Sequence, residues 1–500
     1  MNKIIFSIHA GKQVPEEPVA RGTIRAGLPT TPPSRCFVKK RVPLLLCTLL
    51  LSVAGVQAQR VALFDRDRLP QPVFHSHPGL VELYWRAWEE AWEQAQKLSR
   101  GRQEETIRLQ DIAFTALYCK YAPHLLPGIK TLDHFYFPVL EGTATPAGVE
   151  RLDTPPILAW VEEEYDRFTG DGKRMEMLLQ DKRFLQRYFN WFDSLTPATR
   201  LPFPHQPVTL EKKGDGYRRV DDSDQGDGLL RVDVISQQAL SALCIARLAG
   251  LTGDKATAKE FRERYKALKT IVNTRYWNEE TGTYHDLKAR DLSPVKVKTL
   301  AACWAMLAEI PAPGQARRMI DLVQDTSAFE GSVPWLPARA GLEREEGVNR
   351  QDDAWGTVAY AGIKALERYD LLEEADELAY NLLIHLHATF TRLESHALRE
   401  CYSPLPAGAT HDTDGWPALC PISLFIENVL GFHRVDAREG IVEWRKYHRG
   451  LHGIKNLSFG EITADIIGDD HAIQVETNEP FTLIVNGKSH RVRKGSNTFR

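Results

Sequence analysis

Apolar side chains recur every three or four residues between about residues 79 and 435, a spacing typical of amphipathic helices. In the stretch 81–99 the stripe consists of Tyr84, Trp85, Trp88, Trp92 and Ala95. The same spacing predicts further helices at 156–169, 182–194, 236–249, 258–276, 296–309, 315–324, 355–368, 372–395 and 420–431. Several of them end in Gly or Gly-Asp, as at Gly170-Asp171, Gly250 and Gly253-Asp254.

The pattern changes after Arg438 to short runs of alternating residues. They span 462–467, 472–476, 481–485 and 489–492, and Asn486-Gly487 between the last two is a strong hairpin signal. These runs predict a small antiparallel β unit at the C-terminus. Because so small a unit is marginal alone, we expect it to pack on the helical body.

The order of these elements restricts the fold class. The chain has no strand–helix alternation and no glycine-rich phosphate loop, which argues against Rossmann and P-loop enzymes. Ten or more paired helices with loops rich in Asp, Gly and Trp predict an all-α (α/α)6 toroid carrying the small β unit. Helical periodicity alone equally permits a solenoid.

The first sixty residues resemble an export signal. Lys39, Lys40 and Arg41 precede an apolar run over 42–56 and the small-residue ending Val56-Gln57-Ala58. We therefore expect a leader and signal peptide over 1–58, with 1–35 as a misassigned start, then a catalytic domain over 59–437 and a β domain over 438–500. The alternative is a transmembrane anchor, although the run is short for one. The mature protein is expected to be exported, periplasmic or extracellular, with no membrane insertion after cleavage.

Charge and cysteine usage narrow the partners further. The net charge is −3, from 63 basic and 66 acidic residues, so nucleic acid and anionic membranes are poor candidates. The cysteines after the leader are odd in number, scattered and without metal-type spacing: Cys119, Cys244, Cys303, Cys401 and Cys420. Cys401 and Cys420 could pair as a disulfide, and buried free thiols are the alternative.

Taken in order, several loops resemble the trehalase-like glycosidases, in particular glycoside hydrolase family 63 and its mannosylglycerate-hydrolase-like relatives. The matching segments are 77–88 (HPGLVELYWRAW), 154–160 (TPPILAW), 232–237 (VDVISQ) and 276–282 (YWNEETG). Each piece is weakly specific, but the ordered set covers about residues 75–500. The resemblance implies the toroid rather than the solenoid, and a carbohydrate substrate.

Two further loops carry the chemistry that the resemblance implies. Asp221-Asp222-Ser223, with Asp227 following, is similar to the family's D-N-S-x-x-x-D pattern, in which the first Asp is the general acid. The segment 399–404 (RECYSP) is similar to R-E-x-Y-x-P, in which the Glu is the general base. The resemblance therefore implies Asp221 as the acid and Glu400 as the base.

Elementary chemistry agrees with such a pair but identifies it less sharply. Glycoside hydrolysis needs one carboxylic acid to protonate the leaving oxygen and a second carboxylate to activate water or attack carbon. Crowded carboxylates in the Asp221 loop would raise at least one pKa and help an acid stay protonated. Asp222 and Asp215 are rival acids. A solvated or calcium-binding loop is the other interpretation of this segment, and Glu400 could be a surface residue that follows a helix.

The chain departs from the family pattern in its substrate-binding motifs. The segment 349–355 (NRQDDAW) keeps Trp355 but has Gln351 where the relatives have Arg, and 131–134 (TLDH) keeps Asp133 without the Trp. After the base, 414–416 (DGW) retains only Trp416. We take as candidate substrate-binding residues Asp133, Trp335, Gln351, Trp355, Tyr402 and Trp416, each of which could instead be structural.

The leading hypothesis is an exported glycoside hydrolase that cleaves an α-linked glucoside or mannoside with inversion. It needs no organic cofactor and no catalytic metal, with structural calcium as the one metal alternative. The alternatives are a catalytically dead carbohydrate-binding toroid and a sugar epimerase or polysaccharide lyase on a similar fold. The histidines that keep the last two open are His75, His77, His134, His396 and His411.

Overall fold

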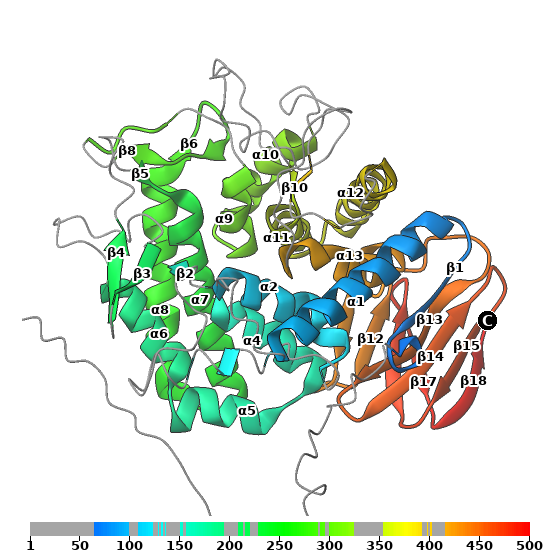
Figure 1. Cartoon of the computed structure of the whole chain (residues 1–500). Coiled ribbons are helices and arrows are strands. Elements are labelled where there is room, and N and C mark those ends of the chain that lie inside the picture. The colour runs from blue at the N-terminus through cyan, green and yellow to red at the C-terminus, as the bar shows by residue number, and fades with distance from the viewer. Residues whose placement is uncertain are drawn as a thin grey trace, which may run out of the picture. The chain divides into compact units, whose positions relative to one another are not determined.

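The computed structural model describes residues 65–99, 109–123, 129, 132–133, 136, 151–153, 157–194, 209–213, 216–220, 229–288, 291–295, 300–324, 354–392, 398, 401–402 and 416–500. Residues from Val61 to Arg500 form one compact unit, and the predicted leader lies outside the described residues. This unit has a helical body and a C-terminal region of sheets (Figure 1).

Six helices contact one another in a closed ring. In order around the ring they are α2 (Leu109–Tyr118), α4 (Leu158–Thr169), α7 (Val232–Leu251), α9 (Cys303–Leu307), α11 (Gly356–Glu367) and α13 (Cys420–Leu424). Each contacts the next, and α13 contacts α2. The helix α13 continues as the π-helical segment η8 (Phe425–Val429). Such a ring can bury helices on every side, which explains why α7 is buried almost all round.

Further amphipathic helices pack on the ring helices, namely α1 (Pro78–Ser99), α6 (Phe184–Ser194), α8 (Lys255–Ile271) and α12 (Leu372–Arg392). The helix α10 (Pro313–Gln324) contacts β7 (Thr283–Tyr284). In α8 the buried residues are Thr257, Ala258, Phe261 and Leu268, so one stripe packs inward and the rest faces solvent. The predicted helices are confirmed with shifted ends. Within the described residues, the helix predicted at 296–309 consists of a 3-10 turn over Leu300–Ala302 and α9, which ends at Leu307. The pattern had not singled out α2.

Gly-Asp pairs connect consecutive helices. Gly170 ends α4 with a φ of 66°, and its N–H donates to the Asp166 carbonyl at 2.7 Å. Asp171 then caps the short helix α5 (Gly172–Glu176) by accepting from the Arg174 N–H at 3.0 Å. Asp254 caps α8 in the same way, through the Thr257 N–H. A left-handed Gly and a carboxylate cap together turn the chain sharply between two helices.

Short antiparallel pairs lie in the connections of the helical body. β2 (Arg151–Asp153), β3 (Thr209–Lys213) and β4 (Gly216–Val220) form one small sheet. β5 (Leu229–Leu230) pairs with β8 (Leu287–Lys288), β6 (Trp277–Asn278) with β7 (Thr283–Tyr284), and β9 (Ala354–Trp355) with β10 (Cys401–Tyr402). No parallel pair occurs among the described residues of the body, in agreement with the all-α prediction.

Two sheets make up the C-terminal region. One has the order β1 (Gln71–Phe74), β13 (His452–Phe459), β14 (Ile462–Gly468), β15 (Ile473–Thr477) and β18 (Gly495–Phe499). The other has the order β11 (Arg434–Asp436), β12 (Ile441–Trp444), β16 (Phe481–Val485) and β17 (Lys488–Val492). Asn486 and Gly487 both have positive φ, which confirms the predicted hairpin.

The region is antiparallel except at one place. β12 and β16 pair in parallel, from Ile441 opposite Thr482 to Trp444 opposite Val485, which corrects the purely antiparallel prediction. The physical reason is the three intervening strands β13, β14 and β15, which belong to the other sheet, so the chain leaves β12 and later returns beside it at β16. The predicted strands at 462–467, 472–476, 481–485 and 489–492 are confirmed, whereas β1, β11, β12, β13 and β18 were missed.

Apolar contacts join the sheets to the helical body. Trp444 stacks on Phe432 with ring centroids 5.0 Å apart, and its indole N–H donates to the Leu430 carbonyl at 2.8 Å. On the other sheet, Phe74 of β1 packs edge-on against Phe425 of η8. The predicted packing of the tail on the body is therefore present. The boundary between 437 and 438 stays a prediction.

Two smaller expectations concern cysteines and membranes. Cys119, Cys244, Cys303 and Cys420 are free and buried, so Cys420 follows the free-thiol alternative and not the disulfide. The helix α7 is long and apolar enough to span a membrane by length and composition alone, but 78% of its most apolar window is buried inside the molecule. Packing within the ring accounts for this composition.

Candidate functional site

The lining of one cavity, together with the ion pair between Arg247 near the end of α7 and Glu309 after α9, indicates that the ring helices run in the same direction. This cavity is lined by residues from the C-terminal ends of four of them, namely α4, α9, α11 and the η8 extension of α13, and by residues that follow α2. The N-terminal ends of these helices therefore point toward the opposite end of the ring; in the 12-residue α4 and α11 the two ends are about 18 Å apart. We call these the C-terminal end and the N-terminal end of the ring.

The segments predicted to carry the chemistry adjoin the N-terminal end. β4 ends at Val220 and β5 leads through Arg231 into α7, so the predicted acid Asp221 falls between two described strands. β9 leads directly into α11, and the 3-10 turn η7 (Trp416–Leu419) leads into α13.

The structure brings two of these segments together. Cys401 is the partner of Trp355, and Tyr402 the partner of Ala354, in the antiparallel pair of β10 and β9. The predicted base Glu400 immediately precedes β10. Asp221, Glu400, Trp335 and Gln351, with the rivals Asp215 and Asp222, lie outside the described residues, as do the side chains of Trp355, Tyr402 and Trp416.

Two neighbouring carboxylates, the half-buried Asp286 and the buried Asp233, lie at the start of α7, at the N-terminal end. The Asp286 Oδ1 accepts a hydrogen bond from the Val232 N–H at 2.8 Å, and Arg231 forms an ion pair with Asp233. Burial, helped by the neighbouring Asp233 carboxylate, raises the pKa of Asp286 from 3.8 to about 6. A carboxyl with such a pKa holds its proton in mildly acidic solution, a property that general acids need.

Sequence reasoning missed Asp286. Its segment, 283–286 (TYHD), directly follows the 276–282 stretch that carries the family resemblance. Its position depends on the pairing of Leu229-Leu230 with Leu287-Lys288, because this pairing places the residue before β8 next to the first turn of α7. Neither two-residue strand is recognisable from an alternating pattern. Through its hydrogen bond with the Val232 N–H, Asp286 holds the segment that follows the predicted acid loop in the sequence, so it is a positioning residue.

Asp133, a predicted substrate-binding residue, has protein partners. Its carboxylate oxygens lie 3.0 and 3.3 Å from Nη1 of Arg174. Arg174 also forms hydrogen bonds with the fully buried Glu162 at 2.7 and 2.8 Å, and the Tyr136 hydroxyl donates to Glu162 at 3.1 Å. These contacts hold α5 to α4. Binding of substrate by Asp133 stays a prediction.

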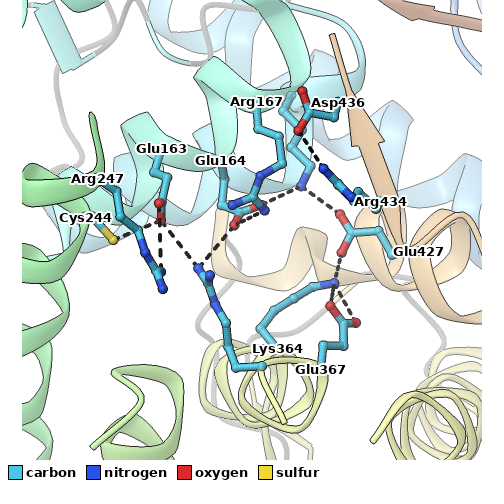
Figure 2. Close-up of polar contacts among 12 residues, drawn as sticks. Glu163, Glu164, Arg167, Cys244, Arg247, Lys364, Glu367, Glu427, Arg434 and Asp436 are labelled. Atoms are coloured by element: carbon cyan, nitrogen blue, oxygen red, sulfur yellow. Dashed lines mark hydrogen bonds and ion pairs between the residues drawn. The ribbon is translucent and has the colours of Figure 1, made fainter. Parts of the chain in front are cut away.

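The C-terminal end of the ring holds a dense network of ion pairs (Figure 2). Side chains from α4, α7, α11, η8 and β11 point toward one another there. Glu427 is the hub: Nζ of Lys120 lies 2.9 Å from its carboxylate, and Lys364 and the Tyr121 hydroxyl also contact it. Burial opposes ionisation of Glu427, but Lys120 and Lys364 outweigh burial and lower the pKa of its carboxyl.

A metal centre is the remaining kind of site. Among the described residues, no three side chains of His, Cys, Asp or Glu are grouped so that they could hold a metal ion. The Asp-rich loop at 221–227 lies outside those residues.

Comparison with known proteins places the chain in a class. Residues 80–414 match the family described as the mannosylglycerate hydrolase MGH1-like glycoside hydrolase domain. This match agrees with the predicted resemblance to trehalase-like, family 63-type glycosidases. The chain belongs to the mannosylglycerate hydrolase MGH1-like family.

Individual relatives are distant. An uncharacterized protein of Borreliella burgdorferi is 27% identical over 328 residues, which cover 62% of this chain and 66% of that protein. The periplasmic trehalase of Salmonella typhimurium is 22% identical over 260 residues, 47% of this chain and 44% of the trehalase. The matches thus span less than two thirds of these curated relatives.

A solved structure supports the fold. The family 63 mannosylglycerate hydrolase from Thermus thermophilus, solved in complex with glucose, superimposes with a TM-score of 0.50 at 16% identity. The superposition covers 69% of this chain and 99% of that enzyme. At this identity the likeness concerns the fold alone.

Proposed function

We propose that the protein is an exported glycoside hydrolase that cleaves an α-linked glucoside or mannoside with inversion of configuration. The observation that carries the proposal is the family match over residues 80–414, which includes both loops with the predicted acid and base. The pairing of β9 with β10 supports it, because this pairing joins the segment directly after Glu400 to the entry of α11. The proposed body is a complete (α/α)6 toroid with its active site at the N-terminal end.

In the proposed mechanism Asp221 protonates the glycosidic oxygen while Glu400 deprotonates a water on the opposite face of the sugar ring. Inversion requires the two carboxyls to be about 6.5–9.5 Å apart, which leaves room for that water. Trp335, Gln351, Trp355, Tyr402 and Trp416 would surround the sugar. Aromatic side chains suit this role because a flat apolar face covers the C–H face of a pyranose.

Export is part of the same proposal. The cationic start and apolar run that precede Ala58 support it, as does the likeness to a trehalase described as periplasmic. The mature protein recovered from the native envelope fraction should begin at Gln59. A mature, membrane-embedded chain that retains residues 42–56 would instead indicate an anchored protein.

The decisive experiment is a screen of α-linked disaccharides and aryl α-glycosides with product analysis by NMR. We expect hydrolysis, and the first-formed sugar should have the β configuration. Asp221→Asn and Glu400→Gln should each lower kcat by about 10²–10⁴-fold. Azide should partly rescue Glu400→Gln, because it replaces the activated water as nucleophile.

Neighbouring carboxylates provide matched controls. Asp224→Asn and Glu394→Gln make the same chemical changes close by in the sequence and should keep near-parental rates. If Asp221→Asn and Glu400→Gln also keep them, the assignment is wrong and Asp222 and Asp215 come next. If the parent binds sugars without cleaving them, the carbohydrate-binding alternative holds, whereas epimerised or unsaturated products would indicate an epimerase or a lyase.

A further inference from the structure

The cavity at the C-terminal end of the ring, here called the basal cavity, has no part in the proposed hydrolysis. Its volume is about 330 Å³. Small-molecule sites occupy about 300–1,000 Å³, so the basal cavity is large enough for one small molecule. Glu427 and Lys364 are buried at its inner part, while Asp370 is exposed at its rim, so the cavity leads inward from the surface.

The charges that line the basal cavity are balanced. Five cationic side chains, Lys120, Arg167, Lys364, Arg368 and Arg434, face five carboxylates, Glu164, Glu367, Asp370, Glu427 and Glu443. A cavity with an excess of one sign would select a ligand of the opposite sign. Here neither an anion nor a cation would find an excess of opposite charge.

The cations are also already paired with carboxylates. Nζ of Lys364 lies 2.8 Å from Glu367 and also contacts Glu427. Nη1 of Arg434 lies 2.7 Å from Glu443, and Nη1 of Arg167 lies 3.0 Å from Glu164. An ionic ligand would therefore have to break a pair and leave one partner uncompensated, which is costly for buried groups. Hydroxyl groups avoid that cost, because they donate to the carboxylates and accept from the cations with every pair intact.

Aromatic rings complete the lining. Tyr121, Trp160, Phe168 and Phe432 line the cavity among its charges, and Tyr121 and Phe168 meet edge to face at 5.0 Å. Next to Trp160, the fully buried Tyr360 hydroxyl has no hydrogen-bond partner among the described residues. Flat apolar faces among groups that both donate and accept match the C–H and O–H surfaces of a sugar or polyol.

The hub of the cavity lies in an irregular part of its helix. Glu427 belongs to η8, where the α-helical α13 changes to π-helical turns. Such single turns inside helices occur frequently at functional sites, because the extra residue per turn re-aims a side chain. Here the group is a carboxylate on η8 that contacts Lys120 and Tyr121, which follow α2, and Lys364 of α11 around the cavity.

We propose that the basal cavity is a second ligand site, which binds a neutral, hydroxyl-rich small molecule of the monosaccharide or polyol class. It lies at the opposite end of the ring from the proposed active site. Its occupation does not depend on whether the protein hydrolyses glycosides.

Hydrogen–deuterium exchange of the full chain tests this proposal, with D-glucose, D-mannose and glycerol as neutral probes. D-Glycerate and choline serve as the anionic and cationic probes. We expect the neutral probes to slow amide exchange saturably in 364–372 and 430–436. The slowing should reach about tenfold when the probe concentration is near ten times its Kd, because binding reduces opening by the factor 1 + [L]/Kd.

A filling variant supplies the second measurement. Leu372 lines the cavity and is half-buried, so Leu372→Trp should abolish the slowing. Leu251→Trp makes the same change at an exposed residue outside the lining and should leave the slowing intact. If Leu372→Trp does not fold, the exchange of the parent alone decides.

Three results would overturn the proposal: no slowing in 364–372 and 430–436 with any neutral probe, slowing with only a charged probe, or slowing confined to 221–233 and 398–418. The last result would leave the proposed active site supported and the basal site refuted. If the protein hydrolyses no glycoside but the neutral probes still slow exchange in 364–372 and 430–436, the basal site is supported and the proposed active site is refuted.

Discussion

Two carboxylates, Glu164 and Asp286, have opposite electrostatic surroundings at the two ends of the ring. At the C-terminal end, the burial of Glu164 is outweighed by Arg167 and Lys120, which lower the pKa of its carboxyl. At the N-terminal end, Asp286 has Asp233 beside it, and its pKa rises to about 6. A depressed pKa indicates a structural ion pair, whereas a raised pKa next to the predicted acid loop is the type of perturbation found at catalytic sites.

The raised pKa of Asp286 makes stability depend on pH. Its folded-state pKa of about 6 lies above the ordinary 3.8, so the folded protein binds the proton more tightly than the unfolded chain. The contribution of this group to the free energy of unfolding is therefore fully present below pH 3.8 and is lost as the pH rises through about 6. The full loss is about 3 kcal/mol as an upper value.

Asp286→Asn should remove this dependence while its amide oxygen still accepts the Val232 N–H. Urea unfolding from pH 4 to pH 7 should show the parent losing stability relative to the variant over that interval. Asp321→Asn, on the exposed surface of α10, is the control and should track the parent. Parallel curves for the parent and Asp286→Asn would contradict the raised pKa.

Among the elements, helix ends determine how the body connects to the sheets. Gly431 follows η8 with a φ of 87°, and its carbonyl accepts the Arg445 N–H at 2.8 Å. A Cβ on Gly431 would lie 2.1 Å from the Arg445 carbonyl oxygen. Glycine is required here for two reasons, the left-handed backbone and the close approach of another strand.

A pair of substitutions separates these two reasons. Gly450 also has a positive φ, of 72°, but nothing lies within 4 Å of a Cβ added there. Gly450→Ala should therefore cost about 1–2 kcal/mol of unfolding free energy, the cost of the left-handed conformation alone. Gly431→Ala should cost about 3 kcal/mol or more, because the backbone clash adds to it. If chemical denaturation gives equal losses of unfolding free energy for the two variants, the backbone at Arg445 moves away from the added Cβ at no measurable cost.

At the scale of the whole molecule, the sheets and the helical body share one apolar junction. Phe432, which follows η8, stacks on Trp444. Arg438 pairs with the buried Asp166 through two hydrogen bonds of 2.6 Å. Arg445 of the sheet region likewise donates to Asp376 of α12 at 2.9 Å. Elements that bury their charges and rings against each other are expected to unfold together.

We therefore predict a single calorimetric unfolding transition for the mature chain, with coincident changes in near-UV and far-UV circular dichroism. Phe432→Ala should lower stability by about 3–5 kcal/mol and shift the whole transition. Phe499→Ala, on the edge strand β18, should shift it less because Phe499 is only partly buried. Two resolved transitions would instead support the predicted boundary at residue 438 as a true domain boundary.

The sequence by itself determined the helices, the final strands and the family. Helical periodicity is a local property of consecutive residues, so stripes such as Tyr84, Trp88 and Trp92 are readable without a fold. The Asn486-Gly487 hairpin is equally local. The motif-bearing loops placed the chain among family 63-type glycosidases and nominated Asp221 and Glu400, which stay predictions.

Only the tertiary structure decided how distant segments meet. Three strand pairings join residues far apart in the chain: β12 with β16, β9 with β10 at Trp355 and Cys401, and β1 with β13. No local pattern encodes such pairings. The same reason hid Asp286 and the basal cavity. Glu427 lies 306 residues from Tyr121, and its charge acquires partners only when the ring closes and excludes water from between them.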